Sequence, residues 1–187
     1  MNVSSPPVRH RLSVNEFERM AQAGILAEDE RVELIEGDLI DMTPIGSRHA
    51  GAVSRLTRAF SLAVGADVIV SVQNPIRLDR YSQPQPDLAL LRPRADFYAE
   101  AHPQPADVLL IVEVAEASLA YDRDVKIPLY ARHGIPEVWL LDVAGRCLTA
   151  HRAPGPDGYG EQRHIVEAQP LAAALLPAAV IDLAGLV

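Results

Sequence analysis

The run Val108-Leu109-Leu110-Ile111-Val112-Glu113-Val114-Ala115 decides the fold of this chain. All of its residues except Glu113 are apolar, whereas a strand with one face in water alternates apolar and polar side chains. The run therefore predicts a strand that is buried on both faces of a sheet. An ionised carboxylate in such a strand costs several kcal/mol unless a cation or several hydrogen-bond donors compensate its charge. We expect a divalent metal ion or a lysine beside Glu113.

Further apolar runs predict the rest of the sheet. Pro86 marks the entrance to a strand at 87–91, because proline cannot donate a hydrogen bond inside a sheet. A helix between residue 115 and the apolar run 137–143 predicts a parallel pair, since a strand–helix–strand order needs a crossover connection. The sheet is therefore expected to be mixed, in an α/β fold. Other strand candidates are residues 31–35, 39–42, 67–72, 75–78, 147–152 and 159–167.

Three segments predict helices. Ser13 and Glu16 have the spacing of a capping box, which favours a helix to about residue 23. Apolar residues recur at three- and four-residue steps from 46 to 64, the pattern of an amphipathic helix. A helix at 121–132 places Asp122, Lys126 and Tyr130 on one face. Pro128 either kinks this helix or delays its start beyond residue 124. The apolar tail, 176–183, is expected to dock on the body.

Length and composition suggest one compact unit. The chain has 187 residues, of which 49% are hydrophobic, enough to bury one sizeable core. We expect a single domain at 13–187, preceded by a flexible N-terminal arm at 1–12, which has two prolines and no apolar periodicity. No stretch approaches the roughly 18 apolar residues of a membrane span, and the first residues lack the core of a secretion signal. The protein is expected to be cytoplasmic.

The chain is acidic overall, and nearly all of its positive charges are arginines. A net charge of −8 argues against a protein that coats nucleic acid without specificity, although a local basic cleft can coexist with it. Lys126 is the only lysine among 17 lysine and arginine residues. A lysine is a compact charge, whereas arginine is a wide fork. Lys126 is thus either a surface residue or the member of a site that cannot accept arginine.

Two carboxylates and one ammonium can do one well-defined kind of chemistry. Asp87 and Glu113, on neighbouring predicted strands, could hold Mg²⁺, which takes one or two carboxylates and accepts phosphate oxygens as further ligands. The metal would polarise a phosphodiester, and Lys126 would position the nucleophile or stabilise the charge that develops. The combination predicts phosphodiester hydrolysis, with Mn²⁺ as a possible substitute ion. No HExxH, GxSxG or P-loop motif supports another class of enzyme.

Three segments carry a resemblance to a known family: PDLALL, LLIVEVA and DRDVKIPLYARHGIPEVWLLD. They resemble the Uma-type family of restriction endonucleases, within the PD-(D/E)XK nuclease-like superfamily, over about residues 12–143. The resemblance implies a restriction-endonuclease-like core with a mixed β-sheet flanked by helices, and metal ligands at Asp87 and Glu113. Ala115 stands where the superfamily has its lysine, so the ammonium must come from Lys126.

The same resemblance implies further parts of the site. It places Glu33 near the metal and His49 at the mouth of the substrate site, and the backbone carbonyl of Val114 would complete the metal shell. It also implies nucleic acid, DNA above all, as the partner, and a homodimer.

Alternatives remain at this point. Asp122 and Lys126 could be a surface helix pair, Asp87 a strand-end cap, and Glu113 a carboxylate paired with an arginine. The function is then either that of a metal-dependent nuclease or that of a binding or regulatory module with a weak or inactive site. A basic cleft with residues such as Arg48, Arg55 or Arg123 would favour the nuclease, and an acidic rim would favour the binding module.

Overall fold

The sheet is mixed, as predicted. The computed structural model describes residues 8–27 and 29–187. Its main sheet has six strands in the order β3-β4-β5-β6-β7-β8, and only β5 and β6 run parallel. The strands are β3 (Ile69–Val72), β4 (Leu88–Leu91), β5 (Val108–Ala115), β6 (Glu137–Asp142), β7 (Cys147–Gly155) and β8 (Gly158–Ile165).

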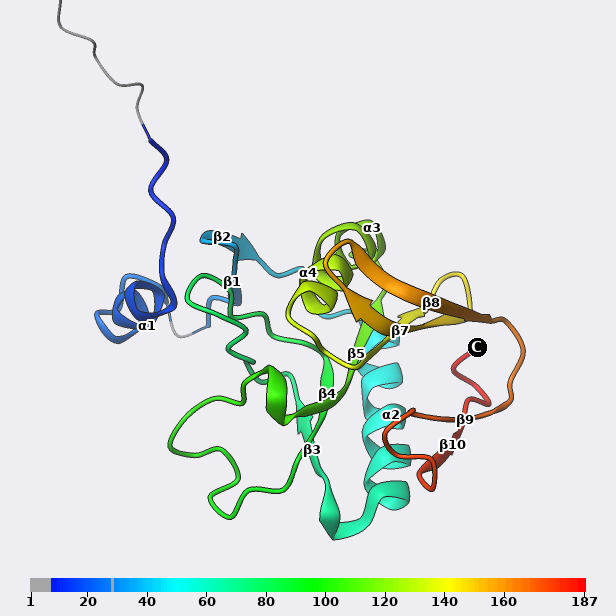
Figure 1. Cartoon of the computed structure of the whole chain (residues 1–187). Helices are drawn as coiled ribbons and strands as arrows, with labels where there is room; N and C mark the ends of the chain where they lie inside the picture. The colour runs from blue at the N-terminus through cyan, green and yellow to red at the C-terminus, as the bar shows by residue number, and fades with distance from the viewer. Residues whose placement is uncertain (1–7, 28) are drawn as a thin grey trace, which may run out of the picture.

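Smaller elements surround this sheet (Figure 1). Two antiparallel hairpins stand apart from it, namely β1 (Val32–Ile35) with β2 (Asp38–Asp41), and β9 (Pro170–Ala172) with β10 (Val180–Asp182). The helices are α1 (Val14–Gln22), α2 (Ser47–Val64), α3 (Leu119–Tyr121), the π-helix η3 (Asp122–Lys126) and α4 (Ile127–Arg132), with short 3₁₀ turns η1 (Gly65–Asp67) and η2 (Pro105–Asp107). None of the described helices combines the length and the hydropathy that crossing a membrane requires.

Strand β5 separates two apolar clusters. All eight of its residues are buried, as the sequence predicts. Leu110, Val112 and Val114 belong to the cluster that contains α2 residues and the C-terminal tail. Ile111 and Ala115 belong to the cluster that contains α4 residues. Because successive side chains of a strand point to opposite faces, Glu113 lies on the α4 face with Ile111 and Ala115.

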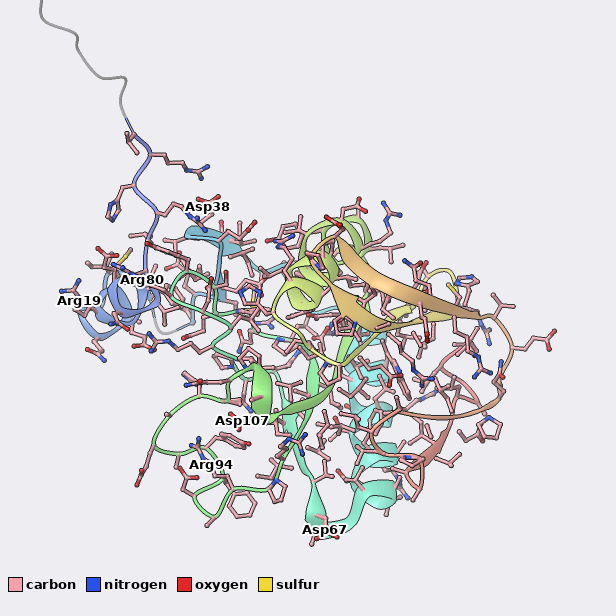
Figure 2. The ribbon with its side chains drawn as sticks, in the orientation of Figure 1. Arg19, Asp38, Asp67, Arg80, Arg94 and Asp107 are labelled. Atoms are coloured by element: carbon pink, nitrogen blue, oxygen red, sulfur yellow. The ribbon has the colours of Figure 1, made fainter. Side chains whose placement is uncertain are left out.

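The N-terminal part confirms the predicted cap. The Ser13 hydroxyl accepts a hydrogen bond from the Glu16 N–H, and Glu16 Oε2 accepts one from the Ser13 N–H at 2.8 Å. Of the predicted arm, residues 1–7 lie outside the described residues. Residues 8–12 form no helix or strand, but the Leu12 N–H donates to the Gly37 carbonyl and Arg9 pairs with Asp38 on the β1–β2 hairpin. Figure 2 shows where Asp38 lies on this hairpin.

The strand predicted at 75–78 is wrong. Its N–H groups bind loop carbonyls instead of a neighbouring strand: Ile76 donates to Pro84, Arg77 to Pro103 and Leu78 to Ser82. The side chains of Ile76 and Leu78 are buried, which explains the apolar pattern. An alternation of apolar and polar residues indicates that every second side chain is buried. Here Ile76 and Leu78 are buried in an extended loop and not in a strand.

Pro128 changes the helix that follows β5. The helical segment begins at Leu119, two residues earlier than predicted, and passes through the π-helical turn η3 before α4. The Ile127 N–H donates to the Asp122 carbonyl, five residues back. Pro128 then occupies the first turn of α4, where its missing N–H is tolerated. The wider turn thus lets the helix continue through a proline.

A buried histidine of β7 makes stability depend on pH. His151 is 5% exposed, and neither ring nitrogen has a hydrogen-bond partner among the described residues. Burial lowers the pKa of its imidazole. The unfolded chain therefore takes up a proton at His151 more readily than the folded chain, so this residue lowers the free energy of unfolding as the pH falls below about 6.5.

His151→Leu is expected to raise the free energy of unfolding by about 1 kcal/mol at neutral pH, because it removes two unsatisfied polar atoms from the core. The difference in the free energy of unfolding should grow toward about pH 5, because protonation of the unfolded chain at His151 destabilises only the wild type. Urea denaturation at the two pH values measures both effects. His164→Leu on β8 is the matched control, since His164 is exposed. A variant that is less stable than the wild type at both pH values would contradict this expectation.

Candidate active site

A pocket of about 650 Å³ lies where distant parts of the chain converge. The β1–β2 hairpin, the N-terminus of α2, the entrance to β4, the end of β5 and η3 all contribute to its lining. The site residues that the sequence predicts all line this pocket: Glu33, His49, Asp87, Glu113, Val114 and Lys126. The structure therefore brings these residues together, although they span 94 positions of the chain from Glu33 to Lys126.

Lys126 lies between two buried carboxylates. Its Nζ is 2.8 Å from Glu113 Oε1 and 3.4 Å from Glu33 Oε2. All three residues are at most 4% exposed. Glu33 Oε2 also accepts a hydrogen bond from the Gln85 N–H at 3.1 Å. The lysine that the sequence marks as unusual is thus the cation that compensates Glu113, and the alternative of an arginine partner is wrong.

Tyr130 holds the same oxygen of Glu113. Its hydroxyl donates to Glu113 Oε1 at 2.6 Å, beside the ammonium of Lys126. Among the described residues, no hydrogen bond reaches Glu113 Oε2. One oxygen of this carboxylate is therefore fixed by two donors from the α4 side, while the other keeps its lone pairs for a ligand in the pocket.

Asp87 connects β4, β5 and α2. Its Oδ2 accepts a hydrogen bond from the Val114 N–H at 2.9 Å, and its Oδ1 lies 3.0 Å from His49 Nε2. Gln73 Nε2 donates to the same Oδ1 at 3.3 Å. Because the N–H and C=O of a strand residue point to the same side, the carbonyl of Val114 also lies on the Asp87 side of β5.

Asp122 is a site residue whose burial the sequence does not predict. It is buried like Lys126, so the interpretation of the two as a surface pair is wrong. Its Oδ2 accepts a hydrogen bond from the Ser118 hydroxyl at 2.5 Å, and it lines the pocket. The four-residue step to Lys126 is its only signal in the sequence, and that step also fits a solvated helix face.

Burial and charge shift the pKa values of the site in opposite directions. Burial raises the pKa of Glu113 to about 8 against the attraction of Lys126, and it raises the pKa of Asp122 as well. Burial opposes the charge of Lys126, but the attraction of Glu113 and Glu33 outweighs it and raises the lysine pKa. The lysine therefore keeps its proton, whereas burial works against the ionisation of Glu113 and Asp122.

At the entrance to β4 the balance is different. The hydrogen bond with Asp87 raises the pKa of His49, although burial opposes this. Burial opposes ionisation of Asp87, but the contacts with His49 and the Val114 N–H lower its pKa overall. Asp87 is therefore ionised and is paired with His49. The second ring nitrogen of His49, Nδ1, is buried and has no partner among the described residues.

The donor set of the pocket fits a hard divalent cation. In the part of the chain that the structure describes, no group of three or more histidine, cysteine, aspartate or glutamate side chains is gathered as a preformed metal cluster. Asp87, Glu113 and Asp122 nevertheless present carboxylate oxygens to one pocket, and Glu113 has a free oxygen there. Oxygen ligands of this kind suit Mg²⁺, which keeps several waters and needs few protein ligands.

The rim of the pocket is acidic. Asp41 and Glu116 line it, and Arg31 is the single arginine among the described residues of the lining. The arginines that would have made a basic cleft lie elsewhere: Arg55 donates to the Gly185 carbonyl, Arg123 pairs with Asp124, and Arg48 does not line the pocket. From the sequence we expect a basic cleft in a nuclease and an acidic rim in a binding module, so this rim favours a binding module.

Comparisons with known proteins agree with this fold. The chain is similar to a solved structure described as "a putative nuclease belonging to DUF820 from Anabaena variabilis ATCC 29413", with a TM-score of 0.71 and 16% identity over 94% of this chain and 97% of that one. At this identity the similarity concerns the fold alone. No curated protein matches the chain. The model of the Uma2 family, described as "Putative restriction endonuclease", matches residues 14–184, beyond the 12–143 of the expected resemblance. The chain therefore belongs to the Uma2 family.

Proposed function

We propose that this protein is a metal-dependent endonuclease that hydrolyses phosphodiester bonds of DNA. The observation that carries the proposal is the buried contact of Lys126 with Glu113, in a pocket shared with Asp87 and Asp122. A structural role alone would not need four carboxylates and one ammonium around a cavity, because buried charges cost stability. The description of the family, a restriction endonuclease, supports a nuclease.

Lys126 is the proposed catalytic cation. Its ammonium would position the attacking water and stabilise the charge that develops on the phosphate. Glu113 and Glu33 keep it protonated and hold its Nζ in place. A charge that is fixed before the reaction needs no rearrangement during it, which makes its stabilisation of the transition state effective. In this proposal Glu33 positions Lys126, and His49 contacts the substrate at the mouth.

Asp87 and Glu113, with the Val114 carbonyl, would hold the metal ion, Mg²⁺ or in its place Mn²⁺. The ion would polarise the phosphodiester and lower the pKa of a bound water. The free Oε2 of Glu113 supports this assignment, and so does the excess of carboxylates over cations in the pocket. Asp122 would add to the negative field that attracts the ion.

The experiment is cleavage of plasmid, linear and single-stranded DNA in Mg²⁺, in Mn²⁺ and in EDTA. The wild type is expected to cut only with a divalent ion. Glu113→Gln keeps the shape of the side chain but removes its charge, so its cleavage should fall to the level of the EDTA control. Glu161→Gln is the matched control, because Glu161 is exposed on β8, and it should cut like the wild type. Equal cleavage by Glu113→Gln and the wild type would contradict the proposal.

A binding or regulatory module is the second candidate, and the acidic rim formed by Asp41 and Glu116 favours it. Such a module would bind nucleic acid or a protein without cutting DNA. A folded wild type that binds a DNA duplex in Mg²⁺ and leaves it intact would support this candidate. Thermal unfolding in the same buffer confirms that the protein assayed is folded.

Other predictions of the sequence have no test here and stay predictions. They are a homodimer, a location in the cytoplasm and a single domain at 13–187. Sedimentation equilibrium measures the first, and limited proteolysis measures the third, because a single domain should resist cleavage within 13–187.

A further inference from the structure

We propose that a nucleic-acid strand leaves the catalytic pocket along helix α2, in a groove between α2 and the end of β3. The inference rests on the proposed function, because it traces the path of that substrate. A second hollow, of about 490 Å³, lies along this side of the helix. Its lining consists of Ile45, Ala50, Val53, Ser54, Thr57, Arg58, Val72 and Gln73.

The two hollows meet at Ile45 and Gln73. Ile45 lines both of them. Gln73 lines the second hollow and donates through Nε2 to Asp87 Oδ1 in the first. The backbone of Gln73 is left-handed, with φ of 52°. Two hydrogen bonds hold it: the Gln73 N–H donates to the Asp87 carbonyl, and Gln85 Nε2 donates to the Gln73 carbonyl. A non-glycine residue keeps such a conformation only where its surroundings fix it, so this junction is a built feature of the site.

The charge of α2 is opposite to that of the chain. The helix has three arginines and no acidic residue, whereas the whole chain has a net charge of −8. Arg48, Arg55 and Arg58 are all exposed. Arg55 donates to the Gly185 carbonyl, but Arg58 makes no ion pair with any described residue and lines the groove. An unpaired arginine at the edge of a groove is suited to a phosphate, which it can bind with two parallel hydrogen bonds.

The rest of the lining fits a sugar–phosphate backbone. Ser54 supplies a hydroxyl group, Gln73 supplies an amide that also bonds Asp87, and Ala50 is small enough to let a backbone approach the helix. No aromatic residue is among the described residues that line the groove, so it offers no platform on which bases could stack. Contacts with phosphates position a nucleic acid but do not distinguish its sequence. The groove should therefore bind with little sequence preference and with strong dependence on salt.

The length of the groove sets the size of this contact. Helix α2 rises about 18 Å from its N-cap, Gly46, to Arg58. That distance corresponds to about five nucleotides of one DNA strand. Arg58 is thus expected to contact a phosphate several nucleotides away from the bond that is cut.

The test is binding of a fluorescein-labelled DNA duplex, measured by fluorescence anisotropy with Ca²⁺ in place of Mg²⁺ at salt concentrations from about 50 to 200 mM. Gel electrophoresis checks that the duplex stays intact. Arg58→Glu is expected to weaken binding about tenfold or more and to lower the salt dependence by about one counterion or more. Arg58→Lys should keep most of the affinity. Arg163→Glu is the matched control, because it changes the net charge equally from the exposed face of β8.

The outcomes separate this inference from the proposed function. If Arg58→Glu alone loses binding while the wild type cuts no DNA, the groove stands and the nuclease proposal fails. If the wild type cuts DNA and Arg58→Glu binds like the wild type, the groove is overturned and the nuclease proposal stands. Equal losses of DNA binding in Arg58→Glu and Arg163→Glu would reflect the change in net charge and would also overturn the groove. A wild type that binds no DNA at the lowest salt concentration would overturn it as well.

Discussion

Lys126→Met is expected to lower the free energy of unfolding by about 3–5 kcal/mol, because removing one partner of a buried ion pair leaves an uncompensated charge. The charges left behind are those of Glu113 and Glu33, which are both buried. Burial already raises the pKa of Glu113 to about 8 with Lys126 present. Without the attraction of Lys126 the pKa of Glu113 rises further, so above about pH 8 only the variant keeps losing stability with rising pH, and the loss should be larger at about pH 9 than at pH 7. Urea denaturation at both pH values measures it.

The same variant should also lose metal-dependent DNA cleavage, since no other lysine exists to replace the ammonium. A double variant, Lys126→Met with Glu113→Gln, separates stability from function. Neutralising both partners should recover part of the lost stability but none of the cleavage. A Lys126→Met variant within about 1 kcal/mol of the wild type at about pH 9 would mean that another group compensates the carboxylates.

Glu137→Leu is expected to cost a similar amount, about 3–5 kcal/mol, for a purely structural reason. Glu137 is fully buried at the start of β6, and its Oε1 accepts hydrogen bonds from Trp139 Nε1 at 2.6 Å and from Arg152 at 2.8 Å. Its Oε2 accepts one from the Ala174 N–H at 2.6 Å. Leucine fills the space but leaves the indole N–H and the backbone N–H without an acceptor in the core. Thermal and urea denaturation measure the loss.

This second effect should leave catalysis intact. Glu137 shares its face of the sheet with Trp139, in the cluster opposite the α4 face where Glu113 lies. Glu137→Leu should therefore cut DNA at the rate of the wild type wherever it is folded. Glu137→Gln keeps one acceptor, and its loss of stability should be smaller. Equal stability of Glu137→Leu and the wild type would show that these hydrogen bonds have substitutes.

Periodicity and charge predict the centre of the site well. Eight residues that are apolar except for one carboxylate indicate a central strand with a compensated charge, and both features are present in β5. The sequence narrows the compensating group to a divalent metal ion or a lysine, with an arginine as the alternative, and Lys126 is the only lysine of the chain. Pro86 likewise predicts that Asp87 lies at the entrance to β4, where it meets the backbone of β5.

The remaining parts of the site depend on tertiary contacts that leave no local pattern. Glu33 lies in a short hairpin, and only packing of that hairpin against η3 brings it to Lys126. The burial of Asp122 follows from the way the helix meets β5, which a four-residue step cannot distinguish from a solvated face. The failure at 75–78 has the same origin, because buried apolar residues in a loop repeat the pattern of a strand.

The π-helical turn also sets the rotational phase of the helix. In an α-helix a four-residue step overshoots a full turn by about 40°, so three side chains at two such steps spiral away from one another. The wider turn of η3 falls short of a full turn over the same step and so cancels much of the overshoot of α4. Lys126 and Tyr130 both reach Glu113 Oε1 from this segment, and Asp122 lines the same pocket. Deleting one residue from η3 would shift that phase and turn Asp122 away from the pocket, although every residue of the site would still be present.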